Sequence, residues 1–214
     1  MEDRRMTLVR RSLLYMPANV PRFVESAWRR GADAIILDLE DSVAPSEKGR
    51  ARSLVRDSIP LAARGASDVF VRVNNRPELL PEDLDASIWP GLAGVAFPKP
   101  EGPEELCALD EAIGRLERER GLSPGSVEVY TSIESAATFL RAREIALATR
   151  RLSHIAISSE DLPRDLGLEP TVEGGEILFA KQYLIYVARE AEAQPLGLMG
   201  TMTRFDDLEA LRES

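Results

Sequence analysis

The chain has one cysteine, Cys107, and one histidine, His154, among its 214 residues. A single cysteine cannot form an internal disulfide, and together these two residues cannot build a zinc site of the cysteine and histidine type. No apolar run approaches the roughly 18 residues that a membrane-spanning helix needs. The charged N-terminus leads into no apolar stretch of the kind found in a signal peptide, so we expect a cytoplasmic protein.

Basic residues are also fewer than acidic residues. The chain has 27 lysines and arginines against 36 acidic residues, a net charge of −9. This balance argues against a general surface for nucleic acid or for anionic membranes. A small anionic substrate would instead need a local cluster of basic residues or a metal ion. The length and the ordinary globular composition predict one domain over residues 1–214.

Short apolar runs and amphipathic segments alternate along the chain. Strands are predicted at 12–17, 33–39, 68–74, 94–99, 127–133, 152–158 and, more weakly, 195–202. Helices are predicted at 21–30, 46–59 (with Ser46 as its N-cap), 103–121, 135–149 and 174–193. This alternation is typical of parallel βαβ units. Seven such units favour an α/β fold of the TIM-type (β/α) barrel, and no glycine-rich nucleotide-binding motif follows any strand.

Polar residues lie at or near the C-terminal ends of six predicted strands. They are Tyr15, Asn19, Asp38, Glu40, Asp41, Arg72, Asn74, Lys99, Glu134, Glu160 and Asp161. In a (β/α) barrel the C-terminal strand ends line the active site. Carboxylates without cysteine ligands favour a hard cation such as Mg²⁺. Glu134 and Asp161 follow neighbouring strands, and we expect them to bind one Mg²⁺.

Structural roles compete with these functional ones. An acid after a strand often caps the next helix, so Asp161 could cap a short helical turn. Arg72 lies in an otherwise apolar strand and must be paired or face a polar barrel mouth, because an unpaired buried charge is prohibitive. His154 lies in mid-strand, which predicts a structural histidine, and Cys107 on its amphipathic helix is expected to be a small core residue.

Five segments carry a resemblance to a known family. They are RRSLLYMPAN at 10–19, GADAIILDLEDSVAPSEKGRAR at 31–52, VFVRVNN at 69–75, SIES at 132–135 and ISSEDLPRDLG at 157–167. In this order and spacing they resemble the HpcH/HpaI aldolase and citrate lyase β-subunit family, most of all its acyl-CoA lyase branch. The resemblance implies a TIM-type barrel that cleaves or forms a carbon–carbon bond next to a CoA thioester.

The resemblance also implies roles for individual residues. Glu134 and Asp161 match the Mg²⁺ ligands, and Glu134 also matches a substrate contact. Arg72 matches the residue that binds the substrate carbonyl or carboxylate and stabilises the enolate. The remaining matches are Tyr15 and Lys48 as contacts to substrate or CoA, Arg22 as a basic residue for the CoA cofactor, and Glu40 and Asp41 as the catalytic acidic pair beside the metal.

The chain departs from the family pattern at several positions. Ala18 and Ser158 stand where the family has glycine, Ser26 stands where it has a basic residue, and Met199 where it has an acid. The family continues past the position of Ser214 with an eighth strand and a C-terminal region, which supplies an aspartate base to a neighbouring subunit. The resemblance therefore implies a barrel incomplete at its eighth strand, and an assembly of three or six copies.

Three functions remain open from the sequence. The first is a Mg²⁺-dependent lyase that cleaves or forms a citryl, malyl or citramalyl thioester, with lowered activity in the absence of the family's base. The second is an aldolase on free 2-oxo acids without CoA, to which the loss of the basic residue at Ser26 lends support. The third is a catalytically impaired relative that only binds an acyl thioester or a partner subunit.

Overall fold

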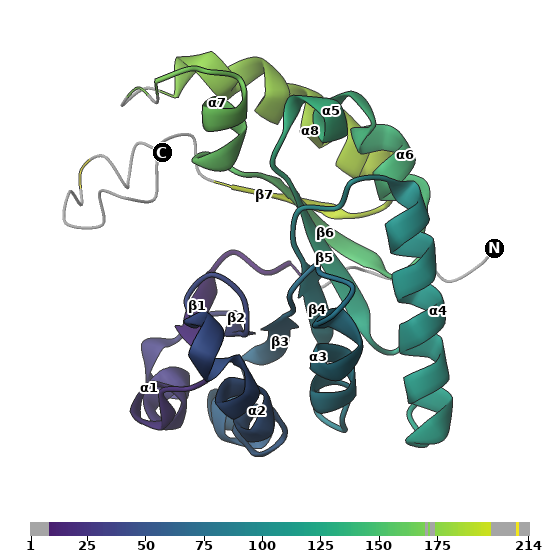
Figure 1. Ribbon diagram of the computed structural model, residues 1–214. Coiled ribbons are helices and arrows are strands. Elements are labelled where there is room, and N and C mark those ends of the chain that lie inside the picture. The colour runs from purple at the N-terminus through teal and green to yellow at the C-terminus, as the bar shows by residue number, and fades with distance from the viewer. Residues whose placement is uncertain (1–8, 170, 172–173, 198–208, 210–214) are drawn as a thin grey trace. The chain divides into compact units, whose positions relative to one another are not determined.

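The computed structural model describes residues 9–169, 171, 174–197 and 209 (Figure 1). The chain divides into two compact units. The first comprises the chain up to Pro98 together with Ala108–Tyr130, and the second comprises Lys99–Cys107 and the chain from Thr131 onward. No helix among the described residues is both long and apolar enough to cross a membrane.

The strands follow one another through the sheet in chain order. The described part of the chain contains seven strands in the order β1-β2-β3-β4-β5-β6-β7. Their bounds are β1 Leu13–Pro17, β2 Ala34–Asp38, β3 Asp68–Arg72, β4 Gly94–Phe97, β5 Glu128–Ile133, β6 Leu152–Ile157 and β7 Gln194–Leu196. Sequential parallel strands joined by helices are the arrangement of a TIM-type barrel, which closes with eight. The predicted fold class is thus confirmed, with seven of those strands in the described residues.

The first unit holds strands β1 to β4, the start of β5, and the helices that connect them. These helices are α1 Pro21–Ser26, α2 Lys48–Ala62, α3 Leu80–Ser87 and α4 Pro103–Glu119, the last of which begins in the second unit. Proline stands at the start of α1 and of α3, where its missing N–H is not needed. The expected cap at Ser46 is wrong: Ser46 lies in a 3-10 turn at Pro45–Glu47, and α2 begins at Lys48 without a side-chain cap.

An apolar cluster and a group of ion pairs hold the strands of the first unit together. Apolar residues from successive strands form a core cluster of Ala34, Ile36, Phe70 and Ala96, with Leu13, Ala93 and Tyr130 packed against it. At the N-terminal strand ends, Arg10 is 3% exposed and donates to Asp68 and to Glu128, each at 2.7 Å. Because β3 and β5 begin at these two acids, the ion pairs tie the two strands to the segment before β1.

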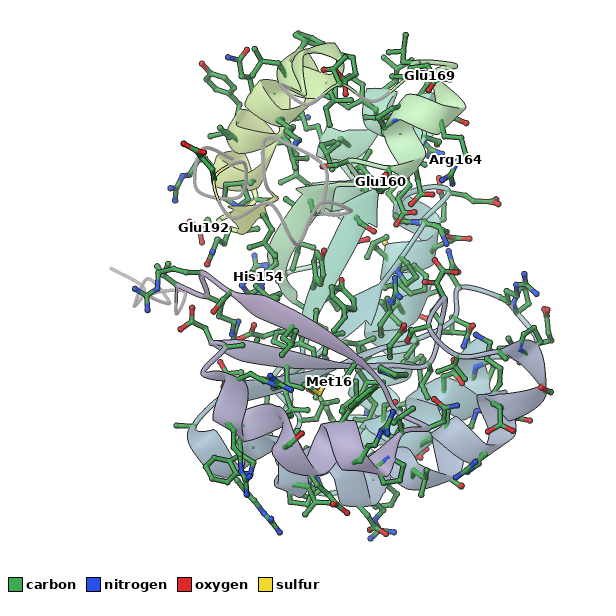
Figure 2. The ribbon with its side chains drawn as sticks, turned by 90° about the vertical axis from the view of Figure 1, so that its left-hand side faces the viewer. Met16, His154, Glu160, Arg164, Glu169 and Glu192 are labelled. Carbon is green, nitrogen blue, oxygen red and sulfur yellow. The ribbon has the colours of Figure 1, made fainter. Side chains whose placement is uncertain are left out.

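The described part of the second unit holds the end of β5, strands β6 and β7, the start of α4 and four further α-helices. The helices are α5 Ala136–Leu140, α6 Ala142–Leu147, α7 Asp161–Asp165 and α8 Leu178–Glu190. All six residues of β6 are buried, as expected for a strand covered on both faces, and they include two polar residues, Ser153 and His154. His154 is fully buried within β6, with Nδ1 2.8 Å from Ser153 Oγ, as expected for a structural histidine (Figure 2).

Three local predictions differ from the structure. The helix expected at 135–149 is broken at Arg141, whose backbone (φ −107°, ψ 8°) is not helical and whose guanidinium binds Glu104 and the Glu101 carbonyl oxygen. Cys107 is exposed rather than buried, and its thiol lies 3.5 Å from the Ala148 carbonyl oxygen. The seventh strand ends at Leu196, and the remainder of its predicted range from residue 198 lies outside the described residues.

Candidate active site

Arg72 forms a two-pronged ion pair with Asp38 in the first unit. The parallel register of β2 and β3 sets these two last strand residues side by side. Arg72 Nε donates to Asp38 Oδ1 and Nη2 donates to Oδ2, both at 2.7 Å. Arg72 Nη1 lies 2.9 Å from Glu40 Oε2. The hydrogen bonds to Asp38 use two of the five N–H groups of the guanidinium, and Glu40 adds an ion-pair contact.

Asp38 is fully buried and accepts further hydrogen bonds from the turn that follows β2. The donors are the backbone N–H of Glu40 at 2.8 Å, the backbone N–H of Ser42 at 3.0 Å and the Ser42 hydroxyl. Burial alone would raise the pKa of Asp38, but the hydrogen bonds and charge of Arg72, together with the Ser42 and Glu40 donors, hold that pKa below its ordinary value. Asp38 therefore fixes both the guanidinium and the loop.

Tyr15 covers one face of this ion pair. The Arg72 guanidinium lies 4.8 Å from the centroid of the Tyr15 ring, and the Tyr15 hydroxyl lies 3.4 Å from that of Tyr130. Burial of the phenol and its Tyr130 neighbour raise the pKa of Tyr15 far above its ordinary value. Tyr15 is thus a hydrogen-bond donor at neutral pH and not a base.

The other residues predicted for the first unit take different places. Lys48 Nζ donates to the carbonyl oxygens of Leu39 at 2.8 Å and Glu40 at 2.7 Å, so it organises the loop after β2; burial lowers its pKa. Asp41 is exposed in the same loop. Arg22 is exposed on α1, with its guanidinium 4.9 Å from the centroid of the Phe23 ring. Contacts of Lys48, Asp41 and Arg22 with substrate or CoA remain predictions.

Glu134 and Asp161 share a cavity in the second unit. The cavity has a volume of about 500 Å³ and is lined by Lys99, Pro100, Glu101, Glu134, Ser135, Thr138, Asp161, Arg164 and Asp165. Glu134 follows β5 directly, and Asp161 is the first residue of α7 after β6. The sequence-based pairing of these two acids is therefore present in the structure. Figure 2 shows Glu160 and Arg164 in the α7 segment that carries Asp161.

The two carboxylate oxygens of Glu134 differ in their hydrogen bonding. Ser132, two residues earlier on the same face of β5, donates its hydroxyl hydrogen to Glu134 Oε1. Glu134 Oε2 is buried and has no hydrogen-bond partner among the described residues. Burial raises the pKa of Glu134 to about 7; the nearby Asp161 adds to this rise, while Ser132 and Lys99 oppose it.

Asp161 is held by its own helix turn. The Ser158 hydroxyl accepts a hydrogen bond from the Asp161 backbone N–H at 3.0 Å and donates one to Asp161 Oδ2 at 2.9 Å. Asp161 Oδ1 accepts from Arg164 Nη1, also at 2.9 Å. The capping alternative is wrong, because Glu160 occupies the N-cap position of α7 and the Asp161 carboxylate accepts no helix N–H in these contacts.

The donor set suits Mg²⁺ better than a metal that needs a dense ligand cage. The described residues contain no group of three or more histidines, cysteines or acids arranged to hold a metal ion. Mg²⁺ is commonly held by one or two carboxylates, with water and substrate oxygens completing its shell. The buried bare oxygen of Glu134 is the kind of atom that a cation would satisfy. The residues present therefore fit Mg²⁺.

Several polar contacts were not predicted from the sequence. Tyr130, Ser132 and Arg164 were not named as candidates, and the pairings of Asp38 with Arg72 and of Ser158 with Asp161 were not expected. The period of two along β5 could have indicated Ser132, because residues 130, 132 and 134 share one face of a strand. The contacts of Asp38 and Arg164 depend on register and helix geometry, for which a single sequence gives little signal.

Sequential strands joined by helices, with acids and an arginine at C-terminal strand ends, are the arrangement of a TIM-type (β/α) fold, in which those ends carry the functional residues. The family model described as HpcH/HpaI aldolase/citrate lyase matches residues 11–213. The chain belongs to this family, and the resemblance drawn from the sequence motifs is confirmed.

Two curated relatives show which members of the family this chain is similar to. The chain is 36% identical over 193 residues to citrate lyase subunit beta of Escherichia coli strain K12, which covers 90% of this chain and 64% of that protein. It is 32% identical over 170 residues to L-malyl-CoA/beta-methylmalyl-CoA lyase of Cereibacter sphaeroides strain ATCC 17025, covering 77% and 53% respectively. The chain thus spans between about half and two thirds of the length of these relatives.

Solved structures support the fold. A magnesium/glyoxylate complex of Haloferax volcanii malate synthase aligns with a TM-score of 0.80 at 20% identity, covering 94% of this chain and 66% of that one. Protein CitE from Mycobacterium tuberculosis, in complex with magnesium and acetate, aligns with a TM-score of 0.71 at 25% identity, covering 95% and 79%.

Proposed function

We propose that this chain acts as a Mg²⁺-dependent carbon–carbon lyase on a 3-hydroxyacyl thioester, releasing an acetyl thioester and a 2-oxo acid, or running the reverse condensation. Two curated relatives support the reaction class, since they are named as citrate lyase subunit beta and as L-malyl-CoA/beta-methylmalyl-CoA lyase. The CitE structure with magnesium and acetate supports the choice of metal.

One observation carries the proposal: the cavity that holds Glu134 and Asp161. Its two carboxylates have no softer ligand beside them, and one of their oxygens is buried without a partner among the described residues. We assign Glu134 and Asp161 as the residues that hold Mg²⁺. Bound there, Mg²⁺ supplies positive charge that polarises the carbonyl of the 2-oxo acid.

Arg72 stabilises the negative charge that appears when the carbon–carbon bond breaks. Cleavage transfers the proton of the 3-hydroxyl group to a base and leaves the acetyl half as a thioester enolate, which then takes up a proton to become the acetyl thioester. Arg72 is held by two hydrogen bonds to Asp38 and by its ion pair with Glu40, and the Asp38 bonds use two of its five N–H groups. Such a fixed donor stabilises the developing enolate oxygen without the reorganisation that water needs. Tyr15, which is protonated and donates its hydroxyl hydrogen to Tyr130, covers one face of the Arg72 guanidinium.

The proposal extends to the setting of the enzyme. Its ligands are an acyl-CoA or the 2-oxo acid, it acts in the cytoplasm, and it assembles as a trimer or hexamer of single-domain chains. Glu40 and Asp41 are proposed as the catalytic acidic pair, with Lys48 and Arg22 as contacts to substrate and CoA. The Glu40 ion pair with Arg72 supports a role for Glu40 in orienting the guanidinium.

A second candidate is an aldolase that uses free 2-oxo acids without CoA. The observation that favours it lies on α1, where Ser26 turns its hydroxyl back to the carbonyl oxygens of Arg22 and Phe23, at 3.0 and 3.1 Å. Arg22 is the single basic residue within α1. A helix with one cation offers little to the phosphate groups of CoA.

Product formation from defined thioesters tests the proposal. The chain is incubated with Mg²⁺ and with citryl-CoA, malyl-CoA or citramalyl-CoA, and the 2-oxo acid is trapped as its phenylhydrazone while the thioester is followed by chromatography. We expect equal amounts of acetyl-CoA and 2-oxo acid, lost in Asp161→Asn and retained in Asp165→Asn. Turnover of a free aldol of a 2-oxo acid, with no thioester cleaved, would replace the lyase with the second candidate.

A further inference from the structure

Arg164 brings a guanidinium to the cavity that holds Glu134 and Asp161. It is the fourth residue of α7, its side chain is 75% exposed, and it lines the cavity. Its Nη1 donates to Asp161 Oδ1 at 2.9 Å, the one side-chain contact that the described residues give it. Most of its five N–H donors are therefore available to a ligand.

The same carboxylate serves both Arg164 and the proposed metal. Ser158 holds Asp161 Oδ2, which leaves Oδ1 as the oxygen bound by the guanidinium. A cation held by Glu134 and Asp161 would neutralise much of the negative charge of the Asp161 carboxylate and weaken its ion pair with Arg164. The Arg164 guanidinium would then be available to pair with another anion.

The other acids that line the cavity are poorly placed to pair with Arg164 in place of Asp161. Asp165 Oδ2 already accepts the backbone N–H of Ala136 at 2.7 Å. Asp165 also follows Arg164 directly, and consecutive residues on a helix do not face each other. Glu101 lines the cavity but is exposed to water, where an ion pair adds little.

We infer that Arg164 determines substrate specificity by binding a second carboxylate on the 2-oxo acid portion of the substrate. This inference rests on the proposed lyase function. Cleavage of a citryl thioester gives oxaloacetate, which has a second carboxylate, whereas malyl and citramalyl thioesters give glyoxylate and pyruvate, which have none. The planar fork of the guanidinium matches a carboxylate with two parallel hydrogen bonds. Arg164 therefore selects the dicarboxylic class.

Two stable 2-hydroxy acids separate this role from metal binding. (S)-malate and (S)-lactate each offer a carboxylate and a neighbouring hydroxyl to Mg²⁺, but malate alone has a second carboxylate. Calorimetry with saturating Mg²⁺ should show malate binding about tenfold tighter than lactate to the unaltered chain, the gain of one charge-assisted contact. Arg164→Ala should reduce this ratio to about one, and Arg164→Lys to an intermediate value.

Arg189→Ala is the matched control, since Arg189 is exposed in the last turn of α8 and does not line the cavity. It should keep the preference for malate, and circular dichroism confirms that each variant is folded. If lactate binds with Mg²⁺ but malate shows no advantage, or the advantage survives in Arg164→Ala, the role of Arg164 is overturned while the metal site stands. If neither acid binds with Mg²⁺, the proposed function fails and the inference with it.

Discussion

Replacing Asp38 with asparagine tests whether the buried ion pair holds the strand ends of the first unit together. Asp38 is fully buried and accepts both prongs of Arg72, two backbone N–H groups and the Ser42 hydroxyl. Asparagine keeps the shape but not the charge, and turns an N–H₂ group toward some of these donors. Breaking a buried pair by removing one partner costs about 3–5 kcal/mol, so Asp38→Asn should lower the free energy of unfolding by about that amount.

Urea denaturation followed by circular dichroism measures this change, with an unaltered slope expected for the variant. Glu104→Gln is the control, because Glu104 pairs with Arg141 in a largely exposed contact and should leave the midpoint unchanged. In the double variant Asp38→Asn/Arg72→Met the losses should not add, since the uncompensated buried charge is gone. A loss of less than about 1 kcal/mol in Asp38→Asn, the range of surface pairs, would refute the reasoning.

The pH dependence of the same pair has a defined sign. The pKa of Asp38 is lower in the folded chain than its ordinary value, so the unfolded chain binds more protons in the acid range. The stabilisation is complete above the ordinary pKa and is lost as the pH falls through the lowered folded value. Asp38→Asn should therefore lose this part of the acid dependence.

Two further predictions concern the cavity residues and Arg72. Burial raises the pKa of Glu134 from 4.5 to about 7 in the metal-free chain, so between these pH values the folded state binds a proton that the unfolded state has lost. The free energy of unfolding should therefore fall as the pH rises between these values. Urea denaturation should show a flatter decline in Glu134→Gln, and an unchanged decline would contradict the shift. Arg72→Lys keeps the charge but not the two-pronged contact, so turnover of the thioester should fall about 10²–10³-fold with Mg²⁺ affinity retained, whereas near-normal turnover would make Arg72 structural.

The strand ends were predictable because they depend on local patterns. Apolar runs of strand length located β1 to β6, and polar residues directly after them marked the end where function gathers. The electrostatic argument that a charge in an apolar strand needs a partner also applied to Arg72, which is paired. These inferences need no knowledge of which strands are neighbours.

The identity of the partners could not be predicted in the same way. Asp38 is the last residue of β2, Glu40 and Asp41 come just after it, and the register between β2 and β3 decides that Asp38 meets Arg72. Short helices such as α3 and α7 carry too few residues for a clear period. The break at Arg141 coincides with contacts of its side chain to Glu104 and the Glu101 carbonyl oxygen, partners that lie far along the chain and that a local pattern does not identify.

The central claim is that Glu134 and Asp161 hold one Mg²⁺, and calorimetric titration of the chain with MgCl₂ tests it most directly. The matched variants are Glu134→Gln and Asp161→Asn, with Asp165→Asn as the control, because Asp165 lines the same cavity but already accepts the Ala136 N–H. We expect one bound Mg²⁺ in the unaltered chain and in the control, and a loss of affinity of at least about tenfold in each of the other two. Unchanged Mg²⁺ affinity in both Glu134→Gln and Asp161→Asn would contradict the account.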